Sequence, residues 1–313
     1  MPGDGMMDVI LLGHGSHRTP DTDQGLREIH RRLQARLAGE SRVALAFFEF
    51  LHPTLAETVA EVAASGARRA VLMPYFLFEG REIQRDIPGE LAHLREQHPA
   101  LAVTMAATLG THPNMVAVAA DRVRAALEES DGTRVGEDAR RAFGERPDEG
   151  GPTDARAPED APGSVPLQSP PARPTAGHLG VVLVNRGVRR QYDDGSRLAE
   201  LCRLLGERLN GEVGGHAGDA LVAPALAENS PRTVEVVAAE LIGRGARRIV
   251  VLPYLHFPGK VLLESVVPAT ERARAAHPEV PHALAATLGV DDRIVAVCAE
   301  RIRAALAGVA PAG

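Results

Sequence analysis

A short apolar run near the start of the chain, Val9-Ile10-Leu11-Leu12-Gly13-His14-Gly15-Ser16, ends on a histidine held between two glycines. An apolar run without alternation is typical of a strand covered on both faces, as in a parallel sheet. The glycines allow a sharp turn and the close approach of another molecule. Ligands of open α/β sheets bind beyond the carboxyl ends of the strands, where His14 falls. The run therefore predicts either a ligand-binding histidine or one that merely caps a loop.

Strand and helix patterns alternate along the first part of the chain. Strands are expected at 8–13, 43–50, 69–78 and 101–107, and helices at 21–37, 53–65, 87–97 and 113–128. Alternation at this spacing implies right-handed crossovers and a parallel sheet.

The same pattern returns in the second part of the chain. Residues 181–188 stand where 9–16 stood, 245–254 repeat 66–75, and 285–289 repeat 106–110 at the same offset as the preceding pair. A duplicated α/β unit suggests two similar domains that face each other across a cleft. The predicted fold class is thus α/β, with a parallel four-stranded sheet flanked by helices in each domain.

The domain boundaries follow from a change in composition. Residues 129–176 are dominated by Pro, Gly, Asp, Glu and Arg, and we expect a disordered linker without chemistry there. Residues 1–128 are then the first domain and 177–313 the second.

Composition excludes several classes of function. The 313-residue chain is 44% hydrophobic and has a net charge of -6, so we expect no nucleic-acid partner. We find no apolar run long enough to cross a membrane and no signal-peptide pattern, which favours the cytoplasm. The two cysteines, Cys202 and Cys298, have no partner at metal or redox spacing, and both are predicted to be buried.

Common catalytic motifs are missing. No Gly-x-Gly-x-x-Gly follows a strand, and there is no P-loop. Ser16 lies in Gly-His-Gly-Ser-His, which is not the nucleophile elbow of α/β hydrolases. No Cys/His cluster has the spacing of a structural zinc site.

Three side chains fall at the carboxyl ends of the first three strands: His14, Glu49 and Glu82. Because these ends share one edge of a parallel sheet, the three groups could converge. An imidazole and two carboxylates suit a divalent metal such as Fe, Co or Ni, and they could equally accept protons. Alternatively, Glu49 pairs with an arginine and Glu82 is a solvated loop residue. The phenylalanines and tyrosines around them fit strand core better than a ligand-stacking wall.

Other histidines have weaker positions. His17, His52 and His112 fit loop or surface residues better than ligands, although His52, three residues after Glu49, is the strongest of them. His256 stands where the first part has a leucine, and burial is favoured slightly over a place in the cleft.

An ordered set of motifs resembles the class II chelatases, and within them the sirohydrochlorin cobalt- and ferrochelatases of the CbiX/SirB type. The motifs are Gly13-His14-Gly15-Ser16, Phe48-Glu49-Phe50 with Pro53, Pro74-Tyr75-Phe76-Leu77-Phe78 with Gly80, Asp86-Ile87-Pro88, and Leu109-Gly110-Thr111-His112-Pro113. The resemblance covers both repeats apart from the linker. It implies two domains of parallel sheet with a cleft for a tetrapyrrole, and insertion of Co(II) or Fe(II) into sirohydrochlorin for cobalamin or siroheme biosynthesis.

Carried over by position, the resemblance makes His14 the first catalytic histidine and Glu49 the glutamate that follows the second strand. Glu82 stands where the family has its second histidine, and a carboxylate there mildly favours Fe(II) over Ni(II). Arg186 and Val261 occupy the positions of His14 and Glu82 in the second repeat. That repeat is therefore expected to have lost the metal set and to serve as a lid and substrate wall.

We hypothesise that His14 and Glu82 hold the metal while Glu49 assists deprotonation or completes the ligand set. The carboxylates on the rim of sirohydrochlorin call for polar and cationic partners. The weak candidates for this role are Ser16, Arg81, Arg85, Arg186 and Lys260. No organic cofactor is expected, and a monomer is modestly preferred. The rival readings are a non-catalytic metal- or tetrapyrrole-binding protein and a chelatase of altered specificity, for example for Ni(II).

Overall fold

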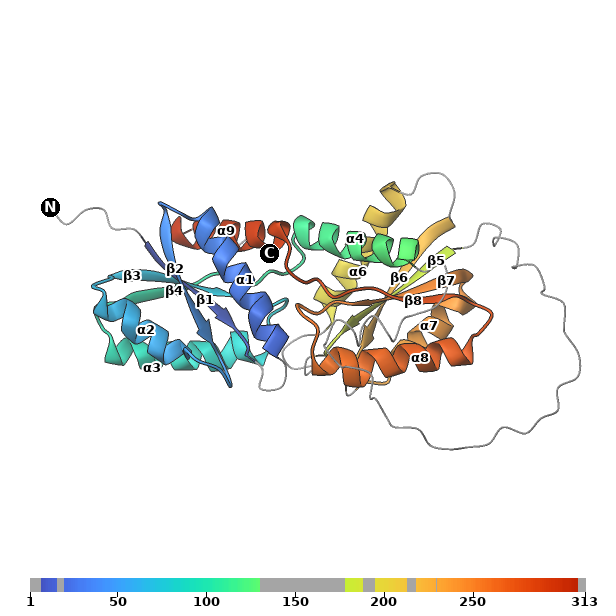
Figure 1. The fold of residues 1–313 in the computed structure, drawn as a ribbon, viewed down its shortest axis with the longest axis horizontal. Coiled ribbons are helices and arrows are strands. Elements are labelled where there is room, and N and C mark those ends of the chain that lie inside the picture. The colour runs from blue at the N-terminus through green and yellow to red at the C-terminus, as the bar shows by residue number, and fades with distance from the viewer. Residues whose placement is uncertain are drawn as a thin grey trace, which may run out of the picture.

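The computed structural model describes residues 7–15, 20–129, 178–187, 195–212, 218–228 and 230–308. These residues form two parallel sheets of four strands, ordered β2-β1-β3-β4 and β6-β5-β7-β8. The sheets lie next to each other along the long axis of the molecule, and helices cover both faces of each (Figure 1). The duplicated α/β fold expected from the sequence is confirmed. The expected linker lies outside the described residues, apart from residue 129.

The first sheet follows the predicted alternation closely. Its part of the chain contains β1 (Met7–Gly13), α1 (Pro20–Arg36), β2 (Ser41–Phe47), α2 (Leu55–Ala64), β3 (Arg69–Pro74), η1 (Glu82–Asp86), α3 (Ile87–Gln97), β4 (Ala102–Met105) and α4 (Pro113–Glu129). Strands β2 and β3 end earlier than predicted, so the residues that follow them are free to form loops beyond the sheet. The five-residue π-helix η1 joins one of these loops to α3.

The second sheet repeats this order. Its part of the chain contains β5 (His178–Asn185), α6 (Ser196–Glu212), β6 (Gly218–Leu226), α7 (Val234–Gly243), β7 (Ala246–Pro253), η2 (Val261–Val266), α8 (Val267–Ala276), β8 (His282–Leu284) and α9 (Asp292–Leu306). Another π-helix, η2, stands at the position that η1 has in the first repeat. The repetition thus extends to irregular details of the backbone.

The central strand β1 is buried on both faces of the sheet, which explains why residues 9–12 are all apolar. Val9 and Leu11 point into the core beneath α1, whereas Ile10 and Leu12 pack on the opposite face beneath α2 and α3, and all four are fully buried. The core on the α1 face continues through both sheets, while the opposite faces have separate cores. The two repeats are therefore joined through one helical layer.

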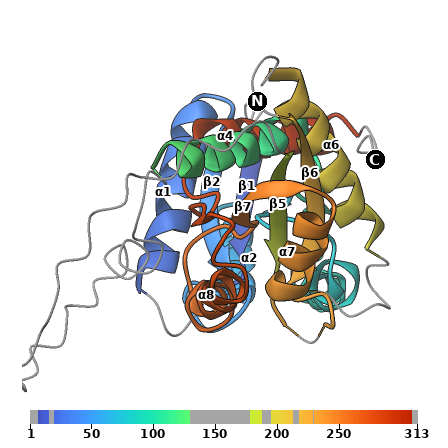
Figure 2. The ribbon, with the colours of Figure 1, turned by 90° about the vertical axis from the view of Figure 1, so that its right-hand side faces the viewer.

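The helix that ends each repeat covers the sheet of the other repeat. Helix α4 packs on α6, β7 and β8, and α9 packs on α1 and β3. Figures 1 and 2 show α4 above the second sheet and α9 above the first. The expected first domain, residues 1–128, therefore differs from the spatial unit, because its last helix closes the other sheet. We call β1–β4 with α1, α2, α3 and α9 the first lobe, and β5–β8 with α4, α6, α7 and α8 the second lobe.

Ion pairs link α4 and α9, which we call the exchanged helices, to the elements around them. Arg32 of α1 lies 2.9 Å from Asp292 at the start of α9, and Arg303 of α9 lies 2.8 Å from Glu40 in the first lobe. Within the layer, Arg293 of α9 bonds Asp121 of α4. Each pair is partly exposed, so its contribution to stability is small compared with the apolar contacts beneath it.

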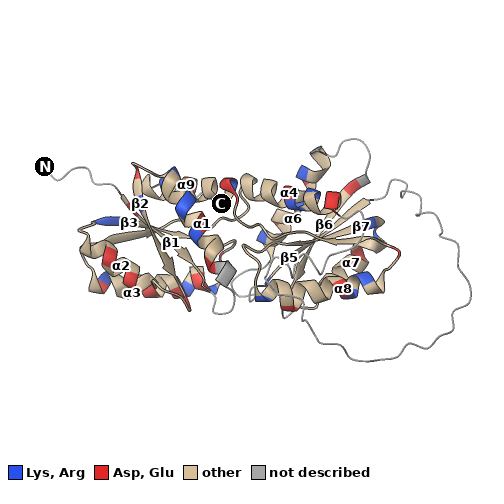
Figure 3. Cartoon of the chain, in the orientation of Figure 1, with Lys and Arg blue, Asp and Glu red and all other residues tan. Residues whose placement is uncertain are grey.

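Charged residues of both signs are interspersed along the outer helices, whereas the strands carry few (Figure 3). Among the described residues, no helix combines the length and apolar character needed to cross a membrane.

Candidate functional site

The backbone brings His14 and Glu49 together at the end of the first sheet. The amide of Phe48 donates to the Gly13 carbonyl and the amide of Glu49 donates to the His14 carbonyl, both at 2.8 Å. Gly15 follows with a φ of +90°, and a Cβ there would lie 1.9 Å from the carbonyl oxygen of Glu49. Only glycine fits this position, because it has no Cβ and adopts a positive φ without strain. These contacts fix two of the three predicted site residues next to each other.

The imidazole of His14 has a defined orientation. Its Nδ1 lies 3.1 Å from the carbonyl oxygen of Gly15. A carbonyl oxygen can only accept a hydrogen bond, so this contact favours the tautomer with the proton on Nδ1. Nε2 then carries a lone pair that can accept a proton or bind a metal ion. The residue is half-buried, which leaves that nitrogen within reach of a ligand.

Two phenyl rings flank this imidazole. The ring centroid of Phe50 lies 6.5 Å from that of His14, and the centroid of Phe76 lies 6.3 Å away. Phe76 comes from the loop after β3 and packs partly on the apolar core. Phe50 is 53% exposed. The candidate site is therefore an imidazole with an aromatic wall and an exposed carboxylate, Glu49, beside it.

Glu82 is the first residue of η1 and is half-buried. Within the described part of the chain, no group of three His, Cys, Asp or Glu side chains is arranged to hold a metal ion. The structure therefore contains no preformed three-ligand site built from His14, Glu49 and Glu82. Their assignment as ligands and catalytic groups stays a prediction.

Most of the predicted rim cations have acidic partners. Arg81 lies 3.0 Å from Asp86, Lys260 lies 3.5 Å from Glu264, and Arg85 is exposed. Exposed ion pairs of this kind are weak, so a substrate carboxylate can compete for the cation. Ser16 and His17 lie outside the described residues.

The second lobe contains a counterpart of the site. The amide of Ala227 donates to the Asn185 carbonyl at 2.9 Å, as Phe48 does to Gly13. Arg186, in the place of His14, lies 3.5 Å from Glu228, in the place of Glu49. The acidic residue is thus retained, and a cation holds it. Our sequence reasoning missed Glu228, although its distance from Thr233 matches that of Glu49 from Thr54, and each threonine is an N-cap.

An aromatic cluster joins the lobes where the loops after β3 and β7 meet. Tyr75 stacks on His256 with 4.3 Å between centroids, and Phe78 stacks on Tyr254 at 5.8 Å. Both tyrosines and Phe78 are buried, so these aromatic residues are core, as expected. His256 is half-buried as a residue, but both ring nitrogens are shielded from solvent. Burial of the ring lowers the pKa of His256 to about 3, against the smaller opposite effect of a backbone hydrogen bond with Tyr75. The structure thus supports burial of this imidazole rather than a ligand role.

The remaining histidine and cysteine candidates have structural surroundings. His52 is exposed and its Nδ1 lies 2.9 Å from Glu57, which closes the capping box of α2 with Thr54. His112 lies 3.1 Å from Glu300 and links the start of α4 to α9. Cys202 and Cys298 are buried, and burial raises the pKa of each thiol to about 12.

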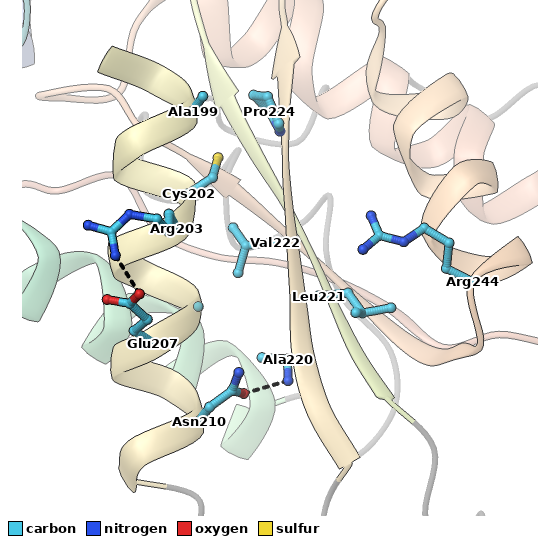
Figure 4. A pocket seen from close by; sticks show the side chains of 11 residues that line it. Ala199, Cys202, Arg203, Glu207, Asn210, Ala220, Leu221, Val222, Pro224 and Arg244 are labelled. Carbon is cyan, nitrogen blue, oxygen red and sulfur yellow. Dashed lines mark hydrogen bonds and ion pairs between the residues drawn. The ribbon is translucent and has the colours of Figure 1, made fainter. Parts of the chain in front are cut away.

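A pocket of about 460 Å³, lined in part by Cys202, lies at the free edge of β6 between α6 and Arg244 (Figure 4). The edge is protected, because Asn210 accepts a hydrogen bond of 2.6 Å from the Ala220 amide and Pro224 has no amide hydrogen. None of the predicted site residues lines this pocket. The cleft expected between the lobes stays a prediction.

The model of the CbiX family matches residues 8–126 and 180–305, most of the chain outside the expected linker. The chain belongs to the CbiX family. The family model matches each repeat separately, so both repeats are copies of the same CbiX unit.

Among curated proteins, the chain is 24% identical to a sirohydrochlorin cobaltochelatase of Priestia megaterium over 98% of this chain and 83% of that protein. It is 28% identical to the chloroplastic sirohydrochlorin ferrochelatase of Arabidopsis thaliana over 40% of this chain and 54% of that protein. A sirohydrochlorin cobaltochelatase of Methanopyrus kandleri is 30% identical and matches over 40% of this chain and 99% of its own length.

Solved structures share the fold. SirB from Bacillus subtilis with Fe³⁺ has a TM-score of 0.67 at 17% identity, with 97% of each chain covered. SirB from Bacillus subtilis subspecies spizizenii in complex with cobalt has a TM-score of 0.62 at 15% identity, with 96% of this chain and 95% of that chain covered. At this identity the likeness establishes the two-lobed architecture alone.

Proposed function

We propose that this CbiX-family chain is a lyase that inserts Co²⁺ or Fe²⁺ into sirohydrochlorin, in cobalamin or siroheme biosynthesis. The observation that carries the proposal is the half-buried His14, oriented at a strand end beside Glu49 in the first lobe. Relatives named as sirohydrochlorin cobaltochelatase and ferrochelatase support the choice of substrate. The metal ion is a substrate, and the proposal requires no organic cofactor.

Metal insertion requires the macrocycle to lose two pyrrole protons and the metal ion to shed water. His14 suits the first task, because the lone pair of a neutral imidazole can accept a proton. The hydrogen bond of Nδ1 to Gly15 leaves Nε2 for this transfer or for the metal ion. The ring nitrogens of His256, at the contact between the lobes, are shielded from solvent and have no such access.

Glu49 and Glu82 are assigned to the carboxylate roles. Glu49 is exposed beside His14 and suits transfer of a proton to water. Glu82 is assigned to the incoming metal ion, and an oxygen ligand there mildly favours Fe²⁺ over Ni²⁺. Their convergence on His14 would take place on binding of metal or tetrapyrrole.

The rim of the macrocycle requires cationic and polar contacts. Arg81, Arg85 and Lys260 follow β3 and β7, and we assign them to substrate carboxylates together with Ser16. Arg186 is held by Glu228 and would bind a carboxylate only when released from it. We also propose a monomer and a cytoplasmic location, both on the sequence alone.

The proposal is tested by mixing the purified protein with sirohydrochlorin and Co²⁺ or Fe²⁺ under anaerobic conditions and following the visible spectrum. Metal insertion above the spontaneous rate is expected, with loss of the acceleration in His14→Ala. His93→Ala is the matched control, because His93 is an exposed histidine of α3. Equal rates with and without wild-type protein would contradict the proposal.

The second candidate is a metal- or tetrapyrrole-binding protein without catalysis, or a chelatase of altered specificity such as nickel insertion. It is favoured by the glutamate at position 82 and by the lack of a three-ligand group among the described side chains. Binding of sirohydrochlorin without acceleration would support the binding protein. Faster insertion of Ni²⁺ than of Co²⁺ or Fe²⁺ would support altered specificity.

A further inference from the structure

Phe50 has an unusual conformation for a bulky residue. Its φ is +67°, and it is the one non-glycine residue with a positive φ in the described part of the chain. The amide of Leu51 donates to the Glu49 carbonyl at 2.8 Å, so Phe50 is the central residue of a three-residue turn. This turn is rare and strained for a residue with a Cβ.

The surrounding contacts hold the turn in place. Before it, Glu49 is bonded to the His14 carbonyl, and Gly15 closes on the Glu49 carbonyl from the other side. After it, the Phe47 amide donates to Pro53 at 2.9 Å, and Thr54 caps α2. The loop between β2 and α2 is therefore fixed at both ends by hydrogen bonds. We call this hydrogen-bonded loop, together with Gly15, the frame, and it sets the direction of the Phe50 side chain.

The frame places an aromatic residue that is more than half exposed near the imidazole. Phe50 is 53% exposed, and its centroid lies 6.5 Å from that of His14 with 34° between the ring planes. An exposed phenylalanine contributes little to folding, and the strained backbone lowers stability. The fold thus keeps an apolar residue more than half exposed near the candidate catalytic group, and a strained backbone holds it there.

The second repeat lacks this arrangement. Its sequence reads Ala227-Glu228-Asn229 where the first repeat reads Phe48-Glu49-Phe50. The repeat that has arginine in place of His14 has therefore lost both phenylalanines as well, while it has kept the glutamate. Of the two repeats, the one with the histidine also has the phenylalanines, whereas the glutamate is present in both.

We propose that Phe50 is a substrate-positioning residue, on which the flat face of the tetrapyrrole rests so that His14 reaches the ring centre. This inference rests on the proposed function. A tetrapyrrole is much wider than a phenyl ring, so a macrocycle that stacks on Phe50 also covers the neighbouring imidazole. Aromatic faces stack on one another in an offset arrangement, which leaves the macrocycle centre displaced from Phe50 towards His14.

The decisive variant is Phe50→Gly, because it separates a binding role from a structural one. Glycine relieves the positive φ, so the variant should unfold at the same temperature as wild type or higher. Loss of the ring should nevertheless raise the Kd for metal-free sirohydrochlorin about tenfold, which corresponds to about 1.4 kcal/mol. In turnover, the KM for sirohydrochlorin should rise while kcat and the KM for the metal change little. Phe50→Trp should restore binding.

Val236→Ala is the matched control, because Val236 on α7 is the other large apolar side chain that is strongly exposed among the described residues. It should change neither Kd nor KM. An unchanged Kd in Phe50→Gly, with wild-type protein active, overturns this inference alone. Protein that binds sirohydrochlorin in a Phe50-dependent manner without inserting metal overturns the proposed function alone. A rise in Kd that Phe50→Trp does not reverse also counts against stacking.

Discussion

The two lobes build the same backbone frame and place different side chains on it. In each, the chain after the second strand bonds back to the end of the first strand, and a glycine with positive φ closes on a glutamate carbonyl. The first lobe has His14 at the centre of this frame, and the second has Arg186, paired with Glu228. Both repeats thus keep the same backbone geometry, whereas only the first has an imidazole at this position, a group that can exchange protons.

The largest expected effect on metal insertion comes from replacing His14 of the first lobe by arginine, the residue at the equivalent position of the second lobe. In His14→Arg the guanidinium cannot give up its proton near neutral pH. It is also expected to pair with Glu49 as Arg186 does with Glu228. We expect metal insertion into sirohydrochlorin to fall at least about a hundredfold, the usual contribution of a general base. Anaerobic turnover checks this, with His93→Arg, at an exposed histidine of α3, as the control. Turnover within a few-fold of wild type would show that His14 has no catalytic role.

The glycines of the two frames should differ in how well they tolerate a methyl group. A Cβ on Gly15 would lie 1.9 Å from the Glu49 oxygen, whereas one on Gly187 would lie 3.3 Å from the Glu228 oxygen. We expect Gly15→Ala to lower the free energy of unfolding by about 3 kcal/mol and Gly187→Ala by about 1 kcal/mol. Urea unfolding measures both. Equal losses would mean that the first frame is no tighter than the second.

The lobe contact offers a third comparison, because His256 stands where the first repeat has Leu77. Burial lowers the pKa of His256 to about 3, so the unfolded chain binds a proton that the folded chain does not between about pH 3 and pH 6.5. Stability supported by the neutral histidine is therefore lost as pH falls through 6.5. We expect His256→Leu to gain about 2 kcal/mol at pH 5 relative to its effect at pH 8.

Unfolding by urea at the two pH values tests this, with His93→Leu on the surface as the control. A difference between His256→Leu and wild type that is the same at pH 5 and pH 8 would mean that His256 titrates normally in the folded protein.

The smallest effect concerns the caps of the exchanged helices. Asp291 caps α9 by accepting from the Arg293 amide, whereas His112 accepts from the Asn114 amide at the start of α4. The Arg293 side chain lowers the pKa of Asp291, so its stabilising effect is present above the unfolded pKa and is lost as pH falls through the lower folded value. Asp291→Asn keeps the cap and removes the charge.

We expect Asp291→Asn to cost about 1 kcal/mol or less at pH 7, because Arg293 is partly exposed, and a smaller amount at pH 2. Thermal unfolding at the two pH values measures the difference. Asp292→Asn is the control, because it removes the same kind of charge from the neighbouring residue, whose side chain is more exposed. A loss of equal size at both pH values would assign the effect to the cap rather than to the ion pair.

Much of the fold was predictable because its signals are local. The buried run at residues 9–12 and the alternation of strands and helices gave the parallel sheet, and the repeat gave the second one. The exchange of α4 and α9 was not predictable. Both helices have an apolar face, and the two sheets that could receive it are built alike, so no local pattern distinguishes the partners.

The site was predictable in part for the same reason. His14 and Glu49 follow from the ends of neighbouring strands, since parallel pairing brings those ends together. The exposure of Phe50 does not follow, because a phenylalanine among other phenylalanines predicts core. Its ring is directed by a turn that depends on Gly15 and on hydrogen bonds between distant segments. Glu82 sits on a π-helix, whose start no sequence pattern indicated.

The exchanged helices also set an order of events during synthesis. The lobe that carries His14 lacks one side of its helical layer until residues 292–306 have left the ribosome, although its own strands are complete some two hundred residues earlier. During that interval β3 and α1 present an apolar surface that α9 covers in the native protein. The sheet that carries His14 is therefore covered on this side only after α9 has been made, so a chain cut before residue 292 should expose the apolar face of β3 and α1.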